Sequence, residues 1–206
     1  MATRLTEKEL MRVKTLLATQ ESLYTVSPSL FDPIVDAAEV VDFAKGAVIM
    51  APGSRIEHVY ILTDGLVGAT YSSGSKTIMH GLAEPGTLLL HGGSFFGRGP
   101  SYVQWEAVVG SRTLRVADAV VRDYLHANHE FAIWMYGMAE NNLRFAEERT
   151  FILSDSAEKR YLKLERDLPR RVFRELSSRV VARYLGITEQ SLARIKRNLL
   201  QNHPSD

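Results

Sequence analysis

The sequence has no cysteine among its 206 residues, which excludes disulfide bonds, thiolate zinc sites and cysteine-ligated iron–sulfur clusters. Long apolar runs are also missing. The longest, such as Leu88–Leu90, extend over only a few residues, so we expect no membrane-spanning segment. The N-terminal residues Met1–Lys8 reach charged side chains at once and lack an apolar signal core. These absences predict a cytoplasmic protein.

An excess of one charge is absent overall, because 25 Lys and Arg nearly balance 24 Asp and Glu. The distribution along the chain is uneven, however. Residues 157–200 contain twelve Lys and Arg against five Asp and Glu, a net charge of +7, whereas residues 1–156 carry a net charge of −5. A basic segment attached to an acidic body indicates that the C-terminal end contacts a polyanion. A solvated helix surface explains the same charge equally well.

Short β-rich runs occupy the middle of the chain, where glycines beside Pro, Ser or Asp separate them as turns require. We expect strands at Val40–Phe43, Val48–Met50, His58–Leu62, Val67–Tyr71, Thr77–Leu82, Thr87–Leu90, Val103–Val109 and Arg112–Val116. Several short strands at this spacing are typical of an antiparallel sandwich or barrel. An amphipathic helix over residues 4–18 is expected before them.

Helical periodicity replaces the glycine-rich pattern beyond Ala119. One stripe of the expected long helix alternates steps of four and three along Trp134, Met138, Asn141, Phe145, Glu148 and Ile152. The stripe either packs on the β domain or forms a dimer seam, in which Asn141 would fix the register. Spacing alone favours neither interpretation. If the stripe forms a dimer seam, the residues at the interface are Trp134, Met138, Asn141, Phe145 and Ile152.

These patterns predict an α+β protein in three parts. Residues 1–121 form an N-terminal helix and an antiparallel β domain, residues 122–154 form the long helix, and residues 155–206 form a helical domain. Ser154–Ser156 breaks the helical pattern and offers side chains that cap the next helix, so we expect a hinge there.

Residues Ser178–Leu200 have the pattern of a helix-turn-helix. Gly186 stands where the chain must turn sharply with positive φ, and Thr188 is a good N-cap for the second helix. Glu189 follows at the positive end of the helix dipole. The inward face of the second helix is formed by Leu192, Ile195 and Leu199.

The opposite face of this second helix suits a DNA major groove, because Arg pairs with guanine, Gln with adenine, and Glu accepts from cytosine. The N-terminal part of the helix reads bases in this docking mode, whereas flanking cations contact phosphates. We expect base contacts from Glu189, Gln190, Ser191 and Arg194. Phosphate contacts are expected from Arg179, Lys196 and Arg197, with Thr188 as the cap. A charged helical hairpin without DNA-binding function is the alternative interpretation.

The segment Val181–Ile195 resembles the helix-turn-helix of the Crp/Fnr family of bacterial regulators, especially the branch with Tyr-Leu-Gly-Ile-Thr at Tyr184–Thr188. Ser156–Tyr161 resembles the start of that family's DNA-binding domain. The resemblance implies a β-roll of the cyclic-nucleotide-binding fold, a double-stranded β-helix that serves as sensor domain. It further implies a long dimerisation helix, a homodimer on a near-palindromic double-stranded DNA operator, and RNA polymerase as a further partner. It implies no enzymatic activity.

Three features depart from the family pattern. The best-known recognition helix opens with Arg-Glu and has an Arg four residues later, whereas Glu189, Gln190 and Arg194 stand here, so a different operator is expected. Only Gln201–Asp206 follow, so no clear β-hairpin wing is expected. Cyclic-nucleotide binders carry a Gly-Glu pair and an Arg before Ser or Thr. Leu88–Tyr102 has no Glu, and its Arg98 is out of register, so we expect an effector other than cyclic AMP.

The candidate effector pocket lies in this same region, and its residues are His91, Gly92, Phe95, Phe96, Arg98, Tyr102 and Trp105. The aromatic residues either line an apolar pocket or belong to the β-domain core. The glycine-rich run Gly92–Gly99 is more typical of a flexible tip than of an anion cradle.

Two other classes of function stay open. A cupin-like metalloenzyme requires histidines in close register with a carboxylate, whereas His58, His80 and His91 are scattered over different strands. We therefore predict no metal site, no catalytic residue and no cofactor, although haem ligation by a histidine stays open. An interaction module that does not bind DNA is the second alternative.

Overall fold

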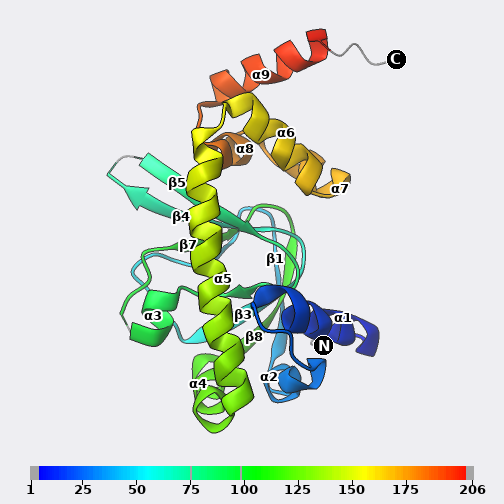
Figure 1. The fold of residues 1–206 in the computed structure, drawn as a ribbon, viewed down its shortest axis with the longest axis vertical. Helices are drawn as coiled ribbons and strands as arrows, with labels where there is room; N and C mark the ends of the chain where they lie inside the picture. Colours follow the sequence, from blue (N-terminus) through cyan, green and yellow to red (C-terminus); the bar gives the residue numbers. More distant parts are fainter. Residues whose placement is uncertain (1–4, 75, 98, 203–206) are drawn as a thin grey trace.

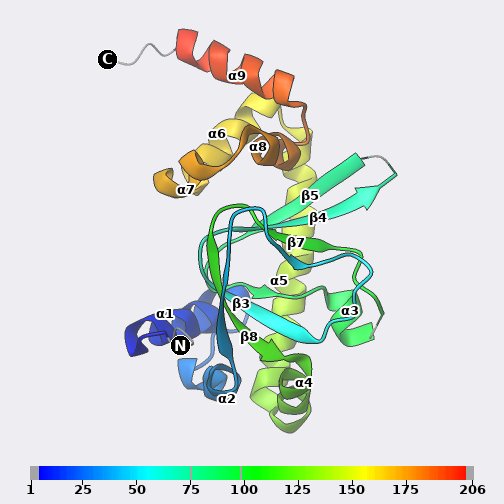
Figure 2. The same cartoon turned by 180° about the vertical axis from the view of Figure 1, so that it is seen from behind.

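The computed structural model describes residues 5–74, 76–97 and 99–202, and its elements follow the predicted order (Figure 1). It is an α+β protein, as the sequence indicates. The long helix α5 (His129–Ser154) runs along one side of the β-roll, and a helical C-terminal domain lies at its far end (Figures 1 and 2). Among the described residues, no helix combines the length and apolar character needed to cross a membrane.

Within the described residues, two antiparallel sheets of four strands form the β-roll, and together they contain the eight strands predicted from the sequence. The first sheet has the order β1 (Glu39–Phe43), β8 (Ser111–Ala117), β3 (His58–Asp64) and β6 (Leu88–Leu89). The second has the order β2 (Val48–Met50), β7 (Gln104–Ala107), β4 (Val67–Ser73) and β5 (Lys76–Ala83).

Strand β3 is buried on both faces, and its alternating side chains serve two different cores. Val59 and Ile61 belong to the cluster beneath the helices, whereas Tyr60 and Leu62 belong to the cluster between the two sheets. A continuous apolar run is therefore required here, in place of the alternation typical of a half-exposed strand.

The N-terminal helix α1 (Glu7–Leu16) starts at a capping box. The backbone N–H of Glu9 donates to the Thr6 hydroxyl (3.3 Å), and the N–H of Thr6 donates to the Glu9 carboxylate (2.7 Å). The chain continues through a π-helical turn at Leu17–Glu21, so the predicted helix over residues 4–18 is largely confirmed. A 3-10 turn (Pro28–Phe31) and the short helix α2 (Asp32–Asp36) then lead into β1.

The segment 122–154 is not a single helix, which corrects the prediction. Helix α4 (Asp118–Ala127) ends before α5 begins at His129. Asn128 between them has an extended backbone, and its side chain accepts a hydrogen bond from the N–H of Phe131 (2.8 Å). It therefore acts as the N-cap of a new helix, a position that Asn favours strongly.

The glycine-rich run after β6 is also ordered differently from the prediction. It forms the short helix α3 (Gly92–Gly97) in place of a flexible tip. The side chain of Phe95 is fully buried beneath it, with the Arg122 guanidinium 4.2 Å from the ring centroid. The burial of this ring stabilises the turn despite the glycines.

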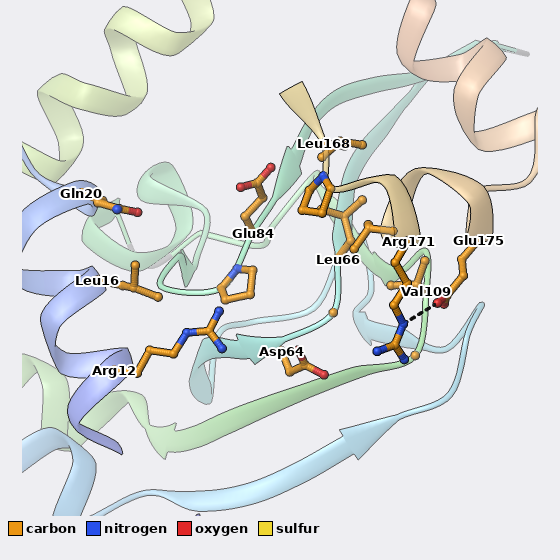
Figure 3. A pocket seen from close by; sticks show the side chains of 15 residues that line it. Arg12, Leu16, Gln20, Asp64, Leu66, Glu84, Val109, Leu168, Arg171 and Glu175 are labelled. Carbon is orange, nitrogen blue, oxygen red and sulfur yellow. Dashed lines mark ion pairs between the residues drawn. The ribbon is translucent and has the colours of Figure 1, made fainter. Parts of the chain in front are cut away.

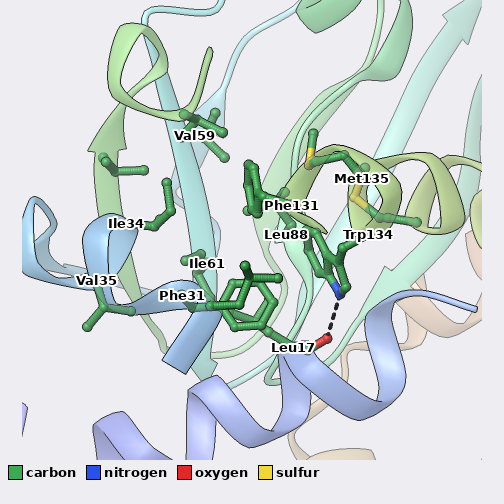
Figure 4. Close-up of a cluster of buried hydrophobic side chains, with 14 of the residues drawn as sticks. Leu17, Phe31, Ile34, Val35, Val59, Ile61, Leu88, Phe131, Trp134 and Met135 are labelled. Carbon is green, nitrogen blue, oxygen red and sulfur yellow. Dashed lines mark hydrogen bonds between the residues drawn. The ribbon is translucent and has the colours of Figure 1, made fainter. Parts of the chain in front are cut away.

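The largest side chain of the core, Trp134, joins three parts of the fold (Figure 4). Its indole N–H donates to the carbonyl oxygen of Leu17 (3.1 Å). Phe31 meets it edge-on at 4.9 Å, and Phe131 stacks on it at 5.6 Å. The inward face of α5, the N-terminal helices and the first sheet therefore share one core.

The C-terminal domain contains α6 (Ala157–Asp167), α7 (Arg170–Glu175), α8 (Ser178–Leu185) and α9 (Glu189–Asn202). It begins where the hinge is predicted, because α5 ends at Ser154 and Asp155 is extended. The Ser156 hydroxyl then accepts from the N–H of Lys159 (3.3 Å) and caps α6. Helix α7 has no counterpart in the sequence prediction.

Glu21 connects the N-terminal segment to the β-roll through its half-buried carboxyl group and to α5 through its backbone. The N–H of Leu88 donates to Glu21 Oε1 (3.0 Å), and the Asn141 amide donates to the Glu21 carbonyl oxygen (3.2 Å). Burial raises the pKa of Glu21 from its ordinary value of 4.5 to about 8, and the Leu88 hydrogen bond opposes this only in part.

This raised pKa predicts a loss of stability with rising pH. The folded state retains a proton that the unfolded state has already released, so the contribution is complete below pH 4.5 and is lost as the pH rises through about 8. We expect Glu21→Gln to remove this loss. The free energy of unfolding of Glu21→Gln minus that of the wild type should increase by up to about 1.4 kcal/mol per pH unit between about pH 5 and pH 8.

Urea denaturation of both proteins across this pH range measures the difference, and the exposed Glu158→Gln serves as the control. Parallel pH profiles for Glu21→Gln and the wild type would show that Glu21 is ionised in the folded state.

Candidate nucleic-acid interface and internal cavity

Helices α8 and α9 form a helix-turn-helix whose turn has the predicted chemistry. Helix α8 is capped by the Ser177 hydroxyl, which accepts from the N–H of Val180 (3.3 Å). Gly186 ends it with a φ of 67°, and the N–H of Ile187 donates to the carbonyl of Ala182 (3.0 Å). The Thr188 hydroxyl accepts from the N–H of Ser191 (3.1 Å) and so caps α9, as predicted.

The inward face of α9 fixes its orientation. Leu192 and Ile195 are only 1% and 9% exposed, and Leu199 packs beside them. They contact a cluster that includes Val181, Ala182 and Leu185 of α8. Burial of this apolar stripe leaves the opposite face of α9 in solvent.

That outer face presents most of the predicted DNA-binding side chains. Glu189, Gln190, Arg194 and Arg197 are exposed on α9, and Arg179 is exposed on α8. Ser191 is half-buried, and its hydroxyl accepts from the Thr188 hydroxyl (3.1 Å). Helix α9 lies at the extreme end of the molecule, so its outer face is open to a large ligand (Figure 1).

Lys196 occupies a different place from the other candidates. It is half-buried and lines a broad hollow of about 1150 Å³ between α6, α7 and α9. Within residues 5–74, 76–97 and 99–202, no ion pair involves Arg179, Arg194 or Arg197. The nearby cations Lys163 and Arg171 are instead paired with Asp167 (2.6 Å) and Glu175 (3.4 Å).

The C-terminal domain packs on the β-roll through α8, which lies against β5. The two domains share one apolar cluster. From the β-roll it includes Leu66, Met79, Val108 and Val109, and from the C-terminal domain Tyr161, Leu164, Leu168, Val181, Ala182 and Leu185. The helix-turn-helix is therefore held to the β-roll by burial of apolar surface.

An arginine of α5 reinforces this junction, and sequence reasoning missed it. Arg149 is only 5% exposed. Its Nη2 donates to the carbonyl oxygen of Tyr184 in α8, and its guanidinium lies 4.1 Å from the centroid of the Tyr184 ring. Nε and Nη1 have no hydrogen-bond partner among the described residues, and burial lowers the pKa of the guanidinium below its ordinary value.

A cleft of about 330 Å³ opens beside the apolar cluster that the two domains share (Figure 3). Arg12 and Leu16 of α1 form one wall, and Arg171 and Glu175 of α7 form the opposite one. The Lys45 ammonium also donates to the carbonyl oxygen of Glu175. The contact between the two domains is thus tightly packed at α8 and open at α7.

The N-terminal half of the stripe weighed as a dimer seam packs on the protein's own β-roll. Trp134 and Met138 are each 1% exposed and belong to the core. Asn141 donates to the backbone of Glu21 (3.2 Å), and the ring of Phe145 lies 6.2 Å from that of His80. Ile152 is half-buried at a small cavity beneath α6. Packing on the β domain therefore describes Trp134, Met138 and Asn141, whereas Phe145 is 39% exposed.

The opposite face of α5 carries a second stripe with the same spacing. It is formed by Ala132, Tyr136, Ala139, Leu143, Ala146, Thr150 and Leu153, which alternate steps of four and three. Tyr136, Leu143 and Leu153 are 58%, 57% and 41% exposed. We call this set the outer seam of α5.

A cavity of about 610 Å³ lies between the second sheet, α3 and α5, and we call it the α5 cavity. Of the predicted effector-pocket residues, His91, Phe96, Tyr102 and Trp105 line it. Phe95 is buried in the core instead and does not line the cavity. Gly92 is the first residue of α3, and Arg98 lies outside the described residues.

Further lining residues come from parts of the sequence that no local pattern connects. Tyr71 and His80 are contributed by β4 and β5, and Met138, Ala139 and Asn142 by α5. Burial lowers the pKa of His80 and of His91, and the proximity of His80 lowers that of His91 further. In the part of the chain that the structure describes, no cluster of three or more His, Asp or Glu is placed to hold a metal ion.

Comparisons with known proteins were made at the level of sequence and of structure. No protein-family model matches the chain, and no curated protein sequence matches it significantly. Solved structures do share its fold. FixK2 from Bradyrhizobium japonicum superposes with a TM-score of 0.67 at 21% identity, over 80% of this chain and 85% of that one.

Two further solved structures superpose on this protein over most of their own chains. The c-di-GMP responsive global regulator CLP of Xanthomonas campestris has a TM-score of 0.68 at 12% identity, over 85% of this chain and 93% of that one. The catabolite activator protein of Thermus thermophilus has a TM-score of 0.55 at 18% identity, over 91% and 87%. At sequence identities this low, the superpositions establish a common fold and nothing further. A β-roll, a long helix and a C-terminal helix-turn-helix are therefore confirmed, and this protein has the fold of the Crp/Fnr transcriptional regulators.

Proposed function

We propose that this protein is a sequence-specific DNA-binding transcription regulator that acts as a homodimer and responds to a small molecule. The observation that carries this proposal is the outer face of α9. It is exposed at the end of the molecule, on a segment of net charge +7, and is oriented by burial of Leu192 and Ile195.

The exposed side chains divide by their position along α9. Those of the first two turns, Glu189, Gln190 and Arg194, reach base edges when the N-terminal part of the helix enters a major groove. Arg197 and Arg179 flank them and are suited to phosphates. Lys196 lies on the flank of α9 beside the hollow, so only the ammonium group at the end of its side chain reaches the phosphate backbone of the DNA.

Dimerisation through the outer seam supports binding to a near-palindromic operator. Its spacing is that of a coiled-coil contact, and small alanines alternate with larger side chains, so two copies of α5 can approach closely. A two-fold axis along this seam relates the two C-terminal domains, and successive major grooves on one face of DNA are ~34 Å apart.

Selection of bound sequences from random duplex DNA tests the proposed role of Arg194. The wild type should enrich a near-palindromic site that contains guanine at the Arg194 contact. Arg194→Ala should lose about 1–3 kcal/mol of binding free energy on that site and relax its specificity there, because one bidentate base contact disappears.

Arg197→Ala is the matched control, because loss of a phosphate contact should weaken binding to all duplexes alike. It should also reduce the slope of the logarithm of the binding constant against the logarithm of the salt concentration by about one. Enrichment of no site by the wild type contradicts sequence-specific binding, and a site indifferent to Arg194→Ala contradicts the role of Arg194.

Sedimentation equilibrium tests the outer seam. Leu143→Glu places two like charges across the two-fold axis and should weaken dimerisation by about tenfold or more. Phe151→Glu is the control, because Phe151 is 75% exposed but lies about 100° around the helix from Thr150 of the seam. A Leu143→Glu protein that dimerises like the wild type would exclude the seam.

A further inference from the structure

We propose that the α5 cavity binds an uncharged, planar aromatic molecule, and that this class of molecule is the effector of the protein. The proposal rests on the proposed function as a ligand-controlled regulator. It adds the chemical class of the ligand, which the resemblance to cyclic-nucleotide-binding domains does not provide.

The walls of the cavity are predominantly aromatic. Tyr71, Phe96, Tyr102 and Trp105 come from the second sheet and from the α3 region, while Leu88, Leu90 and Met138 close the inner end. Phe96 and Tyr102 are 49% and 65% exposed, so large apolar rings stand in solvent at a concave site. A planar ring system that enters between them removes this surface from water and stacks on the aromatic walls.

The polar side chains among the described lining residues carry no fixed charge. Among the described lining residues there is no Asp, Glu, Lys or Arg, and the polar side chains include His80, His91 and Asn142. Burial lowers the pKa of both histidines, and the positive charge of Arg149 lowers that of His80 further, so the neutral imidazole is favoured at both positions. A buried phosphate or carboxylate requires a paired cation, and a buried ammonium requires an anion. An uncharged ligand fits this lining without either.

Two polar side chains indicate how such a ligand is oriented. The Asn142 side chain lines the α5 wall and offers both a donor and an acceptor. Nδ1 of His91 is engaged with the Ser94 hydroxyl (2.8 Å), so only Nε2 is left for a further partner. A ligand with a hydroxyl, carbonyl or ring nitrogen at its edge offers these groups a partner.

The cavity shares helix α5 with the other proposed contacts. Met138, Ala139 and Asn142 form its α5 wall, and Ala139 also belongs to the outer seam. One turn further along α5, Phe145 meets the ring of His80, and one turn beyond that Arg149 binds the carbonyl of Tyr184. A ligand that displaces α5 therefore acts on both the seam and the position of α8.

Three naphthalene probes of the same shape and different charge test the ligand class. Isothermal titration calorimetry of the full-length protein with 2-naphthol, 2-naphthoate and 2-(aminomethyl)naphthalene should show 2-naphthol binding at least about tenfold more tightly than either ion. Tyr102→Ala should weaken the binding of 2-naphthol by about tenfold, because the substitution removes one aromatic wall of the cavity. Phe151→Ala, exposed and outside the cavity, should have no effect.

A charge placed in the wall provides the second test. His91→Lys should invert the preference towards 2-naphthoate, since it supplies the missing cation. Phe151→Lys, which adds a cation at an exposed position outside the cavity, should leave the preference unchanged. Tighter binding of 2-naphthoate or cyclic AMP than of 2-naphthol by the wild type, or binding indifferent to both Tyr102→Ala and His91→Lys, overturns the proposal.

Fluorescence anisotropy on the selected duplex separates this proposal from the proposed function. A change in DNA affinity of about threefold or more on addition of 2-naphthol, abolished by Tyr102→Ala, supports the effector role. Cavity binding with unchanged DNA affinity overturns that role. Absence of DNA binding under every condition overturns the proposed function, whereas the charge preference of the cavity still stands on the calorimetry.

Discussion

A buried guanidinium links the long helix α5 to the helix-turn-helix. Arg149 of α5 holds the C-terminal end of α8 through a hydrogen bond to the Tyr184 carbonyl and through its stacking on the Tyr184 ring. No carboxylate pairs with it within the described residues, and two of its N–H-bearing nitrogens have no acceptor. A buried charge with incomplete partners is costly, and the apolar cluster between α8 and the β-roll offsets that cost. The two contacts act together, so a shift of α5 strains both.

Helix α5 is the element that joins the separate parts of the fold. Its inner face completes the core through Trp134, a second face forms a wall of the α5 cavity, and its outer seam is free for a second copy. Its C-terminal half reaches the helix-turn-helix through Arg149. The proposed binding in the cavity, the proposed association of two copies and the placement of the C-terminal domain therefore involve the same helix. Coupling between them requires only that α5 has two alternative positions.

The features predicted correctly from the sequence are those fixed by local chemistry. The eight strands, the Gly186 turn and the Thr188 cap follow from turn residues, positive φ and side-chain capping, which act over a few residues. The features left open or missed concern choices between partners. Helix α5 has two apolar stripes with the same spacing, and periodicity does not tell which one meets the core. Arg149 and the α5 wall of the cavity were missed because their roles arise from contacts with residues distant in the sequence. The break at Asn128 had a local signal, an N-cap residue, that helical periodicity on both sides obscured.

Hydrogen exchange of the α8 amides tests most directly whether Arg149 fixes the helix-turn-helix to α5. Arg149→Ala should increase the exchange of α8 amides while those of the central strands β3 and β8 stay protected, because only the junction is loosened. Arg144→Ala is the control, since the Arg144 side chain is 61% exposed on the same helix. The account predicts a selective loss of protection in α8. Protection of α8 equal to that of the wild type would show that the apolar cluster alone holds the C-terminal domain and would contradict the role assigned to Arg149.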